Sequence, residues 1–132
     1  MVTLKRSIRL KDQLLLPNGD RLNVNLDVEA HLSELIRAQN GVILAAQELV
    51  KDVERADLQY KFYEAYRELL QIVLGRGGLE RALAAYDGDF GELYSQLDGW
   101  IGAELAPRIR EASAKRVERR KAAARKTLRH MR

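Results

Sequence analysis

Residue types that carry out acid–base or nucleophilic chemistry are sparse in this chain of 132 residues, which holds two histidines and no cysteine. His31 and His130 stand near opposite ends of the chain, and neither has a nucleophile or a metal-ligand spacing beside it. Glu64 and Glu68 have the i, i+4 spacing of two carboxylates on one helix face, but such a pair without further partners is typical of a solvated face. We therefore expect a protein that is not an enzyme.

Two short motifs imitate ligand-binding loops. Gly75-Arg76-Gly77-Gly78 is rich in glycine like a phosphate cradle, but no Gly-Lys-Ser/Thr follows it. Asp87-Gly88-Asp89 begins like a calcium loop, yet its fifth position would be Gly91 and its twelfth Asp98 instead of Glu. Turns between helices explain both motifs, with Asp89 as the N-cap of the next helix. We expect no cofactor and no metal, and the lack of cysteine excludes disulfides.

Charge is divided between two parts of the chain. Residues 107–132 hold eleven Lys or Arg and two acids, a net charge of +9, whereas residues 1–106 hold twelve Lys or Arg and seventeen acids, a net charge of −5. This division predicts a hairpin plus helical body at residues 1–106 and a basic helical tail at residues 107–132. Such asymmetry indicates interaction with an acidic protein, with nucleic acid or with the body of a sister subunit.

The basic tail is expected to be helical, because alanine, arginine and lysine favour helix. A thin apolar seam with one polar member follows heptad spacing at Ala114, Val117, Lys121, Ala124, Leu128 and Met131. Docking on an acidic protein is our first interpretation of the tail, and a non-specific phosphate clamp on nucleic acid is the second. A solvated appendage is the third. The tail residues expected to bind a partner are Arg116, Arg119, Arg120, Lys121, Arg125, Lys126, Leu128 and Arg129.

Alternating apolar residues predict a β-hairpin over residues 3–28. The second half alternates most strictly, and Pro17-Asn18-Gly19-Asp20 supplies residues that favour a tight reversal of the chain. Two strands alone are marginally stable in water, so the hairpin must pack on helices or pair with another chain through its free edges.

Helical periodicity begins near Glu29. The first helix carries an apolar stripe that we expect to face the core, and Asn40-Gly41 is expected to kink or break it. Further helices are expected over residues 57–74, over residues 79–86 and from residue 89 onwards, with Pro107 as either a kink or the first turn of a separate helix. The two main apolar stripes are Leu32, Ile36, Gln39, Ile43, Ala46 and Val50, and then Leu93, Leu97, Ile101, Leu105 and Ile109.

The expected fold class is therefore α+β. An N-terminal β-hairpin packs on a small helical bundle of four to five helices, and a long basic helix forms the C-terminus. No apolar run approaches the ~18 residues that a membrane span needs, and the uninterrupted apolar core of a signal peptide is missing. We expect a cytoplasmic protein without membrane contact.

Aromatic residues cluster on the second predicted helix. Tyr60, Phe62, Tyr63 and Tyr66 cover more than one side of that helix, so some of them must be partly exposed or lie in an interface. Core packing and a protein–protein interface explain the cluster equally well, since tyrosine is favoured in both places. Tyr60, Tyr63 and Tyr66 are the candidate partner-binding residues.

This arrangement resembles the small tail assembly chaperones of long-tailed bacteriophages. The resemblance is carried by the layout of the segments Tyr63-Glu64-Ala65-Tyr66-Arg67-Glu68-Leu69-Leu70 through Gly75, Leu79 to Tyr86, Asp87-Gly88-Asp89 and Pro107 to Lys121. It implies a non-catalytic protein that coats a helical tape-measure-type partner, helps to recruit tail-tube subunits and self-associates.

Our functional expectation is an assembly or scaffolding protein that binds protein partners and forms a homo-oligomer. The alternative is a nucleic-acid-associated accessory protein that uses the basic C-terminal helix as a non-specific phosphate clamp.

Overall fold

The computed structural model describes residues 1–2 and 7–132, and it begins with an antiparallel hairpin of β1 (Arg9–Leu15) and β2 (Arg21–Asp27). The residues between the strands reverse the chain as predicted, because Gly19 takes a positive φ of 89° and the Asp20 amide donates to Asn18 Oδ1 at 3.0 Å. The hairpin prediction is confirmed from residue 9 onwards. Its first residues, 3–6, lie outside the described part of the chain.

The hairpin buries one face and exposes the other. Leu10, Leu22, Val24 and Leu26 are buried on the core side, whereas the opposite side carries polar residues that pair across the strands, as Gln13 Nε2 does with Asn23 Oδ1 at 2.9 Å. Alternation in sequence becomes a two-sided sheet because successive side chains point to opposite faces.

Arginine side chains from the helices reach both edges of this sheet. The Arg108 Nε donates to the Arg9 carbonyl at 3.0 Å, and the Arg81 guanidinium donates to the Arg21 carbonyl at 3.1 Å. The Gln13 backbone amide donates to Asp12 Oδ1 at 2.8 Å. Since these groups already have partners, the edges offer an incoming strand an interrupted ladder, which is a common protection against edge pairing.

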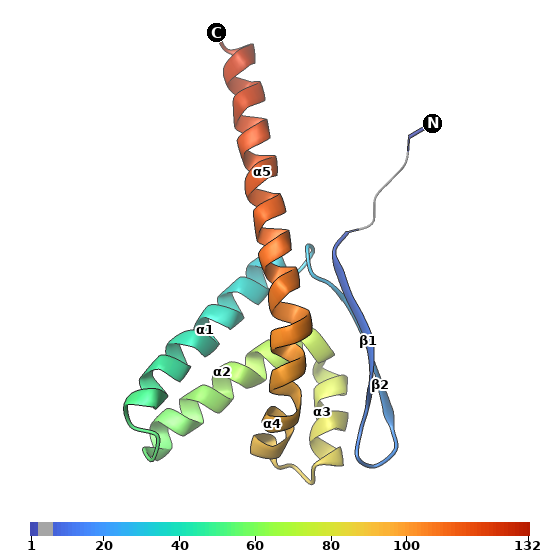
Figure 1. Cartoon of the computed structure of the whole chain (residues 1–132), viewed down its shortest axis with the longest axis vertical. Helices are drawn as coiled ribbons and strands as arrows, with labels where there is room; N and C mark the ends of the chain where they lie inside the picture. The colour runs from blue at the N-terminus through green and yellow to red at the C-terminus, as the bar shows by residue number, and fades with distance from the viewer. Residues whose placement is uncertain (3–6) are drawn as a thin grey trace.

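Helices α1 (Leu32–Lys51) and α2 (Ala56–Leu74) form an antiparallel helical hairpin that extends to one side of the molecule (Figure 1). Of the kink or break predicted at Asn40-Gly41, the break is wrong, because α1 is continuous through it. A helical glycine costs about 1 kcal/mol, and packing of the flanking turns against α2 outweighs that cost. The helix starts later than expected, since the Asp27 side chain accepts from the Ala30 amide at 3.1 Å and holds a turn before it.

Helix α3 (Arg76–Ala85) begins three residues earlier than the predicted Leu79. Only Gly75, with a φ of 75°, separates helices α2 and α3, whereas Gly77 and Gly78 are helical. A Cβ at Gly78 would lie 3.4 Å from both Leu22 Cδ1 and Leu74 Cβ, which is ordinary van der Waals contact, so α3 packs closely on the hairpin and on α2 at this position.

Asp89 caps helix α4 (Phe90–Trp100), as predicted, by accepting from the Glu92 amide at 3.1 Å. The helical path then continues without a break through a π-helical turn, η1 (Ile101–Leu105), into α5 (Ala106–His130). Pro107 lies in the first turn of α5, directly after the π-helical turn, so of the two predicted alternatives it stands at the start of a helical segment.

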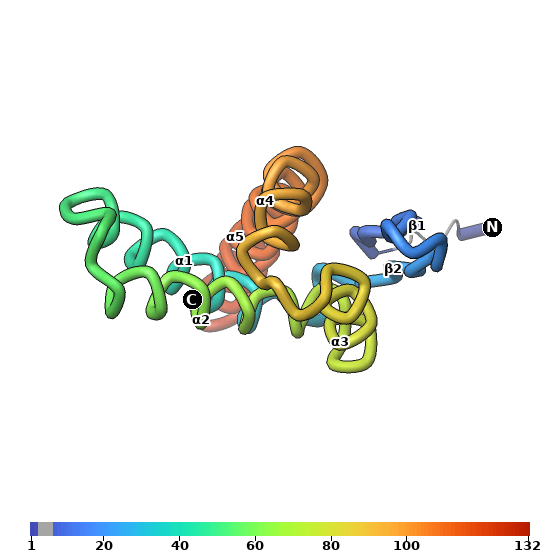
Figure 2. The backbone as a smooth tube through the Cα atoms, turned by 90° about the horizontal axis from the view of Figure 1, so that it is seen from below, coloured from blue at the N-terminus to red at the C-terminus, as the bar shows by residue number. Residues whose placement is uncertain are grey.

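The core lies where one face of the hairpin meets the first half of α1, α2, α3, α4, η1 and the first turns of α5 (Figures 1 and 2). The predicted stripe from Leu93 to Ile109 is buried at all five positions. Ala112 is also buried, so the first two turns of α5 belong to the body, and the structural boundary lies beyond the predicted one at residue 107. The chain is a mixed α+β protein with an N-terminal hairpin and a long C-terminal helix.

Leu70 provides a test of this core. It is 0% exposed, so Leu70→Ala leaves a cavity and should lower the free energy of unfolding by about 2–5 kcal/mol. Leu44→Ala is the matched control, because Leu44 on α1 is 63% exposed and its truncation should change that free energy by less than about 0.5 kcal/mol. Urea unfolding followed by circular dichroism measures both, and equal losses would contradict the packing described.

Candidate interaction surfaces

The C-terminal part of α5 stands free of the body (Figure 1). Every residue from Val117 to Arg132 is exposed, and we call this segment the free tail. Its apolar seam is not covered by the described part of the chain: Val117 is 47%, Leu128 55% and Met131 81% exposed. Seven of the eight predicted tail residues lie in the free tail, namely Arg119, Arg120, Lys121, Arg125, Lys126, Leu128 and Arg129.

Arg116, the eighth predicted residue, has a different position. It is half-buried, and its guanidinium donates to Ser33 Oγ at 2.9 Å, at the start of α1. Its contact is therefore with the chain's own body, and it helps to hold the base of the free tail.

Glu29 is the main anchor of that base. Its carboxylate accepts from the Ile8 amide at 2.9 Å and from Lys115 Nζ at 3.0 Å, and the Arg119 guanidinium lies 3.7 Å away. The hydrogen bond from Lys115 and that from the Ile8 amide hold the pKa of Glu29 below its ordinary value. One carboxylate thus joins the start of the hairpin, the turn before α1 and the emerging tail.

The predicted tyrosine cluster divides between core and surface. Tyr66 is 2% exposed, its hydroxyl donates to Asp98 Oδ1 at 3.0 Å, and burial together with the Asp98 charge raises the pKa of its phenol. Tyr63 is half-buried with its ring 5.4 Å from that of Phe90. Tyr60 is 67% exposed. Of the three candidates, Tyr66 therefore packs α2 against α4, and Tyr60 offers the largest free surface.

The far end of the α1–α2 hairpin carries an apolar surface that sequence reasoning missed. Ile43 and Val50, expected in the core, are 47% and 77% exposed, because the rest of the body does not extend along the second half of α1. A groove of about 310 Å³ lies between the helices there, lined by residues that include Leu49, Phe62 and Tyr94. We call the exposed set the α1–α2 tip; it consists of Ile43, Leu44, Val50, Val53 and Tyr60.

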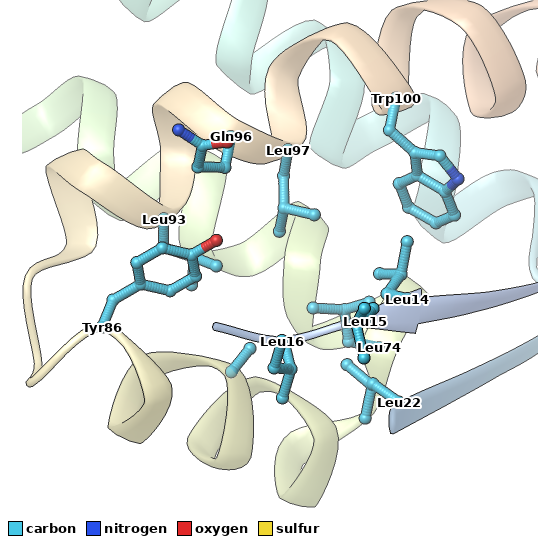
Figure 3. Close-up of a pocket in the computed structure, with 11 residues that line it drawn as sticks. Leu14, Leu15, Leu16, Leu22, Leu74, Tyr86, Leu93, Gln96, Leu97 and Trp100 are labelled. Atoms are coloured by element: carbon cyan, nitrogen blue, oxygen red, sulfur yellow. The ribbon is translucent and has the colours of Figure 1, made fainter. Parts of the chain in front are cut away.

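A second hollow, of about 160 Å³, lies between the end of the hairpin, α3 and α4 (Figure 3). Leucines from the hairpin face Leu97 and Trp100 of α4, and Tyr86 and Gln96 supply polar atoms. The Trp100 indole N–H donates to Asp12 Oδ2 at 2.8 Å, which lowers the pKa of Asp12. We call this hollow the α3–α4 pocket. Leucine side chains make up most of its lining, polar atoms contribute as well, and a carboxylate is bonded to one of its lining residues.

The negative charge of the body is concentrated beside this pocket. Residues 1–76 hold eleven Lys or Arg and eleven acids, so they are neutral in sum. Residues 77–106 hold one basic residue, Arg81, and six acids, a net charge of −5. The acids of this acidic end are Glu80, Asp87, Asp89, Glu92, Asp98 and Glu104. The negative end of the body thus consists of α3, α4 and η1. The net charge of residues 1–106 taken together did not reveal this location.

Within residues 1–2 and 7–132 the structure contains no group of His, Cys, Asp and Glu side chains that could hold a metal ion. None of the helices described is long and apolar enough to cross a membrane. Comparison with models of protein families, with curated proteins and with solved structures finds no match to this chain.

Glu29 generates a prediction about the base of the tail. Glu29→Gln removes the charge that attracts Lys115 and Arg119, so amide hydrogen exchange in residues 113–119 should become faster. Glu34→Gln is the control, because Glu34 is exposed and its nearest partner is His31 at 3.9 Å. Unchanged exchange in the Glu29 variant would contradict an anchoring role.

The same carboxylate predicts a dependence on pH. Because the pKa of Glu29 is lowered in the folded chain, its stabilisation is complete at neutral pH and is lost as the pH falls from its ordinary value of 4.5 through the lower folded value. The protection of residues 113–119 against exchange, taken relative to the intrinsic exchange rate at each pH, should therefore fall in the wild-type chain on acidification. Glu29→Gln should remove much of this pH dependence, and a profile identical to that of the wild type would contradict the assignment.

Proposed function

We propose that this chain is a non-catalytic assembly or scaffolding protein that self-associates and binds a protein partner. The free tail carries this proposal: a basic helix with an exposed apolar seam that the chain's own body leaves uncovered. A helical seam of this kind is the usual form of a helix that packs on another protein. The α1–α2 tip adds a second exposed apolar surface on a different side of the molecule (Figure 1).

The layout that resembles small tail assembly chaperones suggests the kind of partner. A protein of that type would bind a long helical tape-measure-type protein, and the groove beside Leu49 and Phe62 has a suitable apolar lining for one face of a helix. Tyr60 and Tyr63 stand beside this groove or line it, so they keep their proposed role in partner binding. For Tyr66 the proposed role is indirect, through packing of α2 on α4.

Nucleic-acid binding is the second candidate function, and the charge of the free tail favours it. Residues 117–132 hold seven Lys or Arg and one acid, Glu118, a net charge of +6. A helix of this charge displaces counterions from phosphate whatever the base sequence. The tail has no aromatic side chain for stacking on bases, so such binding would be non-specific.

The first test is size-exclusion chromatography with light scattering at about 100 mM and 500 mM salt, on the full chain and on residues 1–116. We expect an oligomer of the full chain that becomes smaller at high salt, and a smaller species for residues 1–116. A monomer of the full chain at both salt concentrations would overturn the proposed self-association.

A gel shift separates the two candidate functions. We expect a 30-base-pair duplex to bind the full chain weakly at about 100 mM salt and to compete poorly with self-association. Tight binding that disperses the oligomer and disappears with residues 117–132 would favour the nucleic-acid function.

Polar substitutions in the α1–α2 tip should change the solubility of the chain without lowering its stability much. Val50→Asp with Val53→Asp should change the free energy of unfolding by less than about 1 kcal/mol in total, because both side chains are largely exposed. The same variant should need more ammonium sulfate for precipitation, since an apolar patch is removed. Phe62→Asp is the contrasting variant: Phe62 is 8% exposed, and the change should unfold the chain. A strong loss of stability in the double variant would contradict the exposed tip.

A further inference from the structure

We propose that the free tail of one chain binds the acidic end of a second copy, with Leu128 or Met131 seated in the α3–α4 pocket, so that copies join head to tail. This inference deepens the proposed self-association and rests on it. It assigns both halves of the contact and the way in which the copies are arranged.

Charge is the first argument. The acidic end carries −5 by sequence, with Glu104 paired to Arg108 at 2.8 Å, and the free tail carries +6, while residues 1–76 are neutral in sum, so one part of the body attracts the tail. Figure 1 shows α3 and α4 at the end of the long axis opposite the C-terminus. The molecule is therefore polarised along its length, and copies placed in line bring opposite charges together.

Apolar fit is the second argument. The α3–α4 pocket has about 160 Å³ of space, and cavities of about 150 Å³ with such linings hold a ligand of benzene size, so one leucine or methionine side chain fits. Leu128 and Met131 are spaced i, i+3 on one face of the tail and are 55% and 81% exposed. Methionine adapts readily to an irregular pocket.

Carboxylates near the α3–α4 pocket are the third argument, because basic residues flank Leu128 on the tail. Asp12 is bonded to Trp100, which lines the pocket, and Glu92 lies one helical turn before Gln96, which also lines it. Arg125 and Arg129 flank Leu128 on the tail by three residues and one residue. A seated Leu128 would therefore place guanidinium groups near carboxylates at the rim of the pocket.

The helical path excludes the same contact within one molecule. The pocket residue Leu97 and the tail residue Leu128 belong to one continuous helical run, thirty-one residues apart. At 1.5 Å per residue this run holds them about 46 Å apart. A tail cannot return to its own pocket without breaking α5, so it binds another copy. Such a contact uses two different surfaces and can repeat, which produces rings of subunits where the rotation closes and open chains where it does not.

Contact between two free tails is disfavoured by the same charges. Pairing two seams would place +6 beside +6, with no acidic face to compensate. The acidic end has the opposite sign and carries the α3–α4 pocket.

Because the chain has no cysteine, single cysteine variants test the contact directly. Leu128→Cys is mixed with Gln96→Cys under mild oxidation, at about 100 mM salt. We expect a disulfide-linked heterodimer of the two variants, which mass spectrometry of the linked peptides identifies. Leu128→Cys mixed with Glu54→Cys is the matched control, because Glu54 is exposed beside the α1–α2 tip, and it should give little product.

Charge exchange is the second experiment. Glu80→Lys with Glu92→Lys, and Arg125→Glu with Arg129→Glu, should each raise the dissociation constant of self-association about tenfold. An equimolar mixture of the two double variants should recover association. Glu48→Lys with Glu54→Lys is the control of equal charge, and it should leave association unchanged.

The outcomes separate this inference from the proposed function. Oligomers that form normally but link residue 128 to residue 54 as readily as to residue 96 would overturn the head-to-tail contact and leave self-association standing. Charge variants of the acidic end that associate like the wild type would also overturn it. A chain that is monomeric under all conditions removes both the contact and the proposed self-association.

Discussion

The fold and the exposed surfaces both depend on one continuous helical run, Phe90 to His130, of which only the first part is covered. Its apolar stripe from Leu93 to Ile109 lies in the core and fixes the direction of everything that follows. Beyond Ala112 the helix receives no further apolar burial, so it continues on helix propensity, on Arg116 and on the Glu29 anchor. A buried segment thus holds an exposed one rigidly at a distance from the body.

Most elements were predictable where local rules and burial agree. The strand alternation around Val24, the turn at Gly19 and the cap at Asp89 are local signals, and the structure confirms them. The predictions are wrong where contacts with neighbouring elements determine the local structure. Asn40-Gly41 looks like a break, but packing on α2 keeps α1 helical, and Gly78, which looks like part of a turn, lies within α3 where this helix packs on Leu22.

The candidate surfaces were harder to predict, because exposure depends on where the body ends. The stripe of α1 is apolar along its whole length, yet Val50 and Ile43 are exposed since no element covers them. Tyr60 and Tyr66 have the same residue type and neighbouring turns, but only the second faces α4. The tail was recognisable from composition alone because sixteen successive residues share one environment. The acidic end required knowledge of which helices lie together.

The π-helical turn η1 changes the rotation of the side chains around the helix axis between the core part of the run and the tail. In a regular helix a step of four residues overshoots one turn by about 40°, so a stripe spaced every four residues from Leu93 to Ile109 would wind about 160° around the axis. The wider turn at Ile101–Leu105 takes up part of that drift and keeps Leu105 and Ile109 on the core. It also sets the direction around the helix axis in which the side chains of α5 point. The direction in which the tail presents its seam is therefore set in the core, by one extra residue in a single turn.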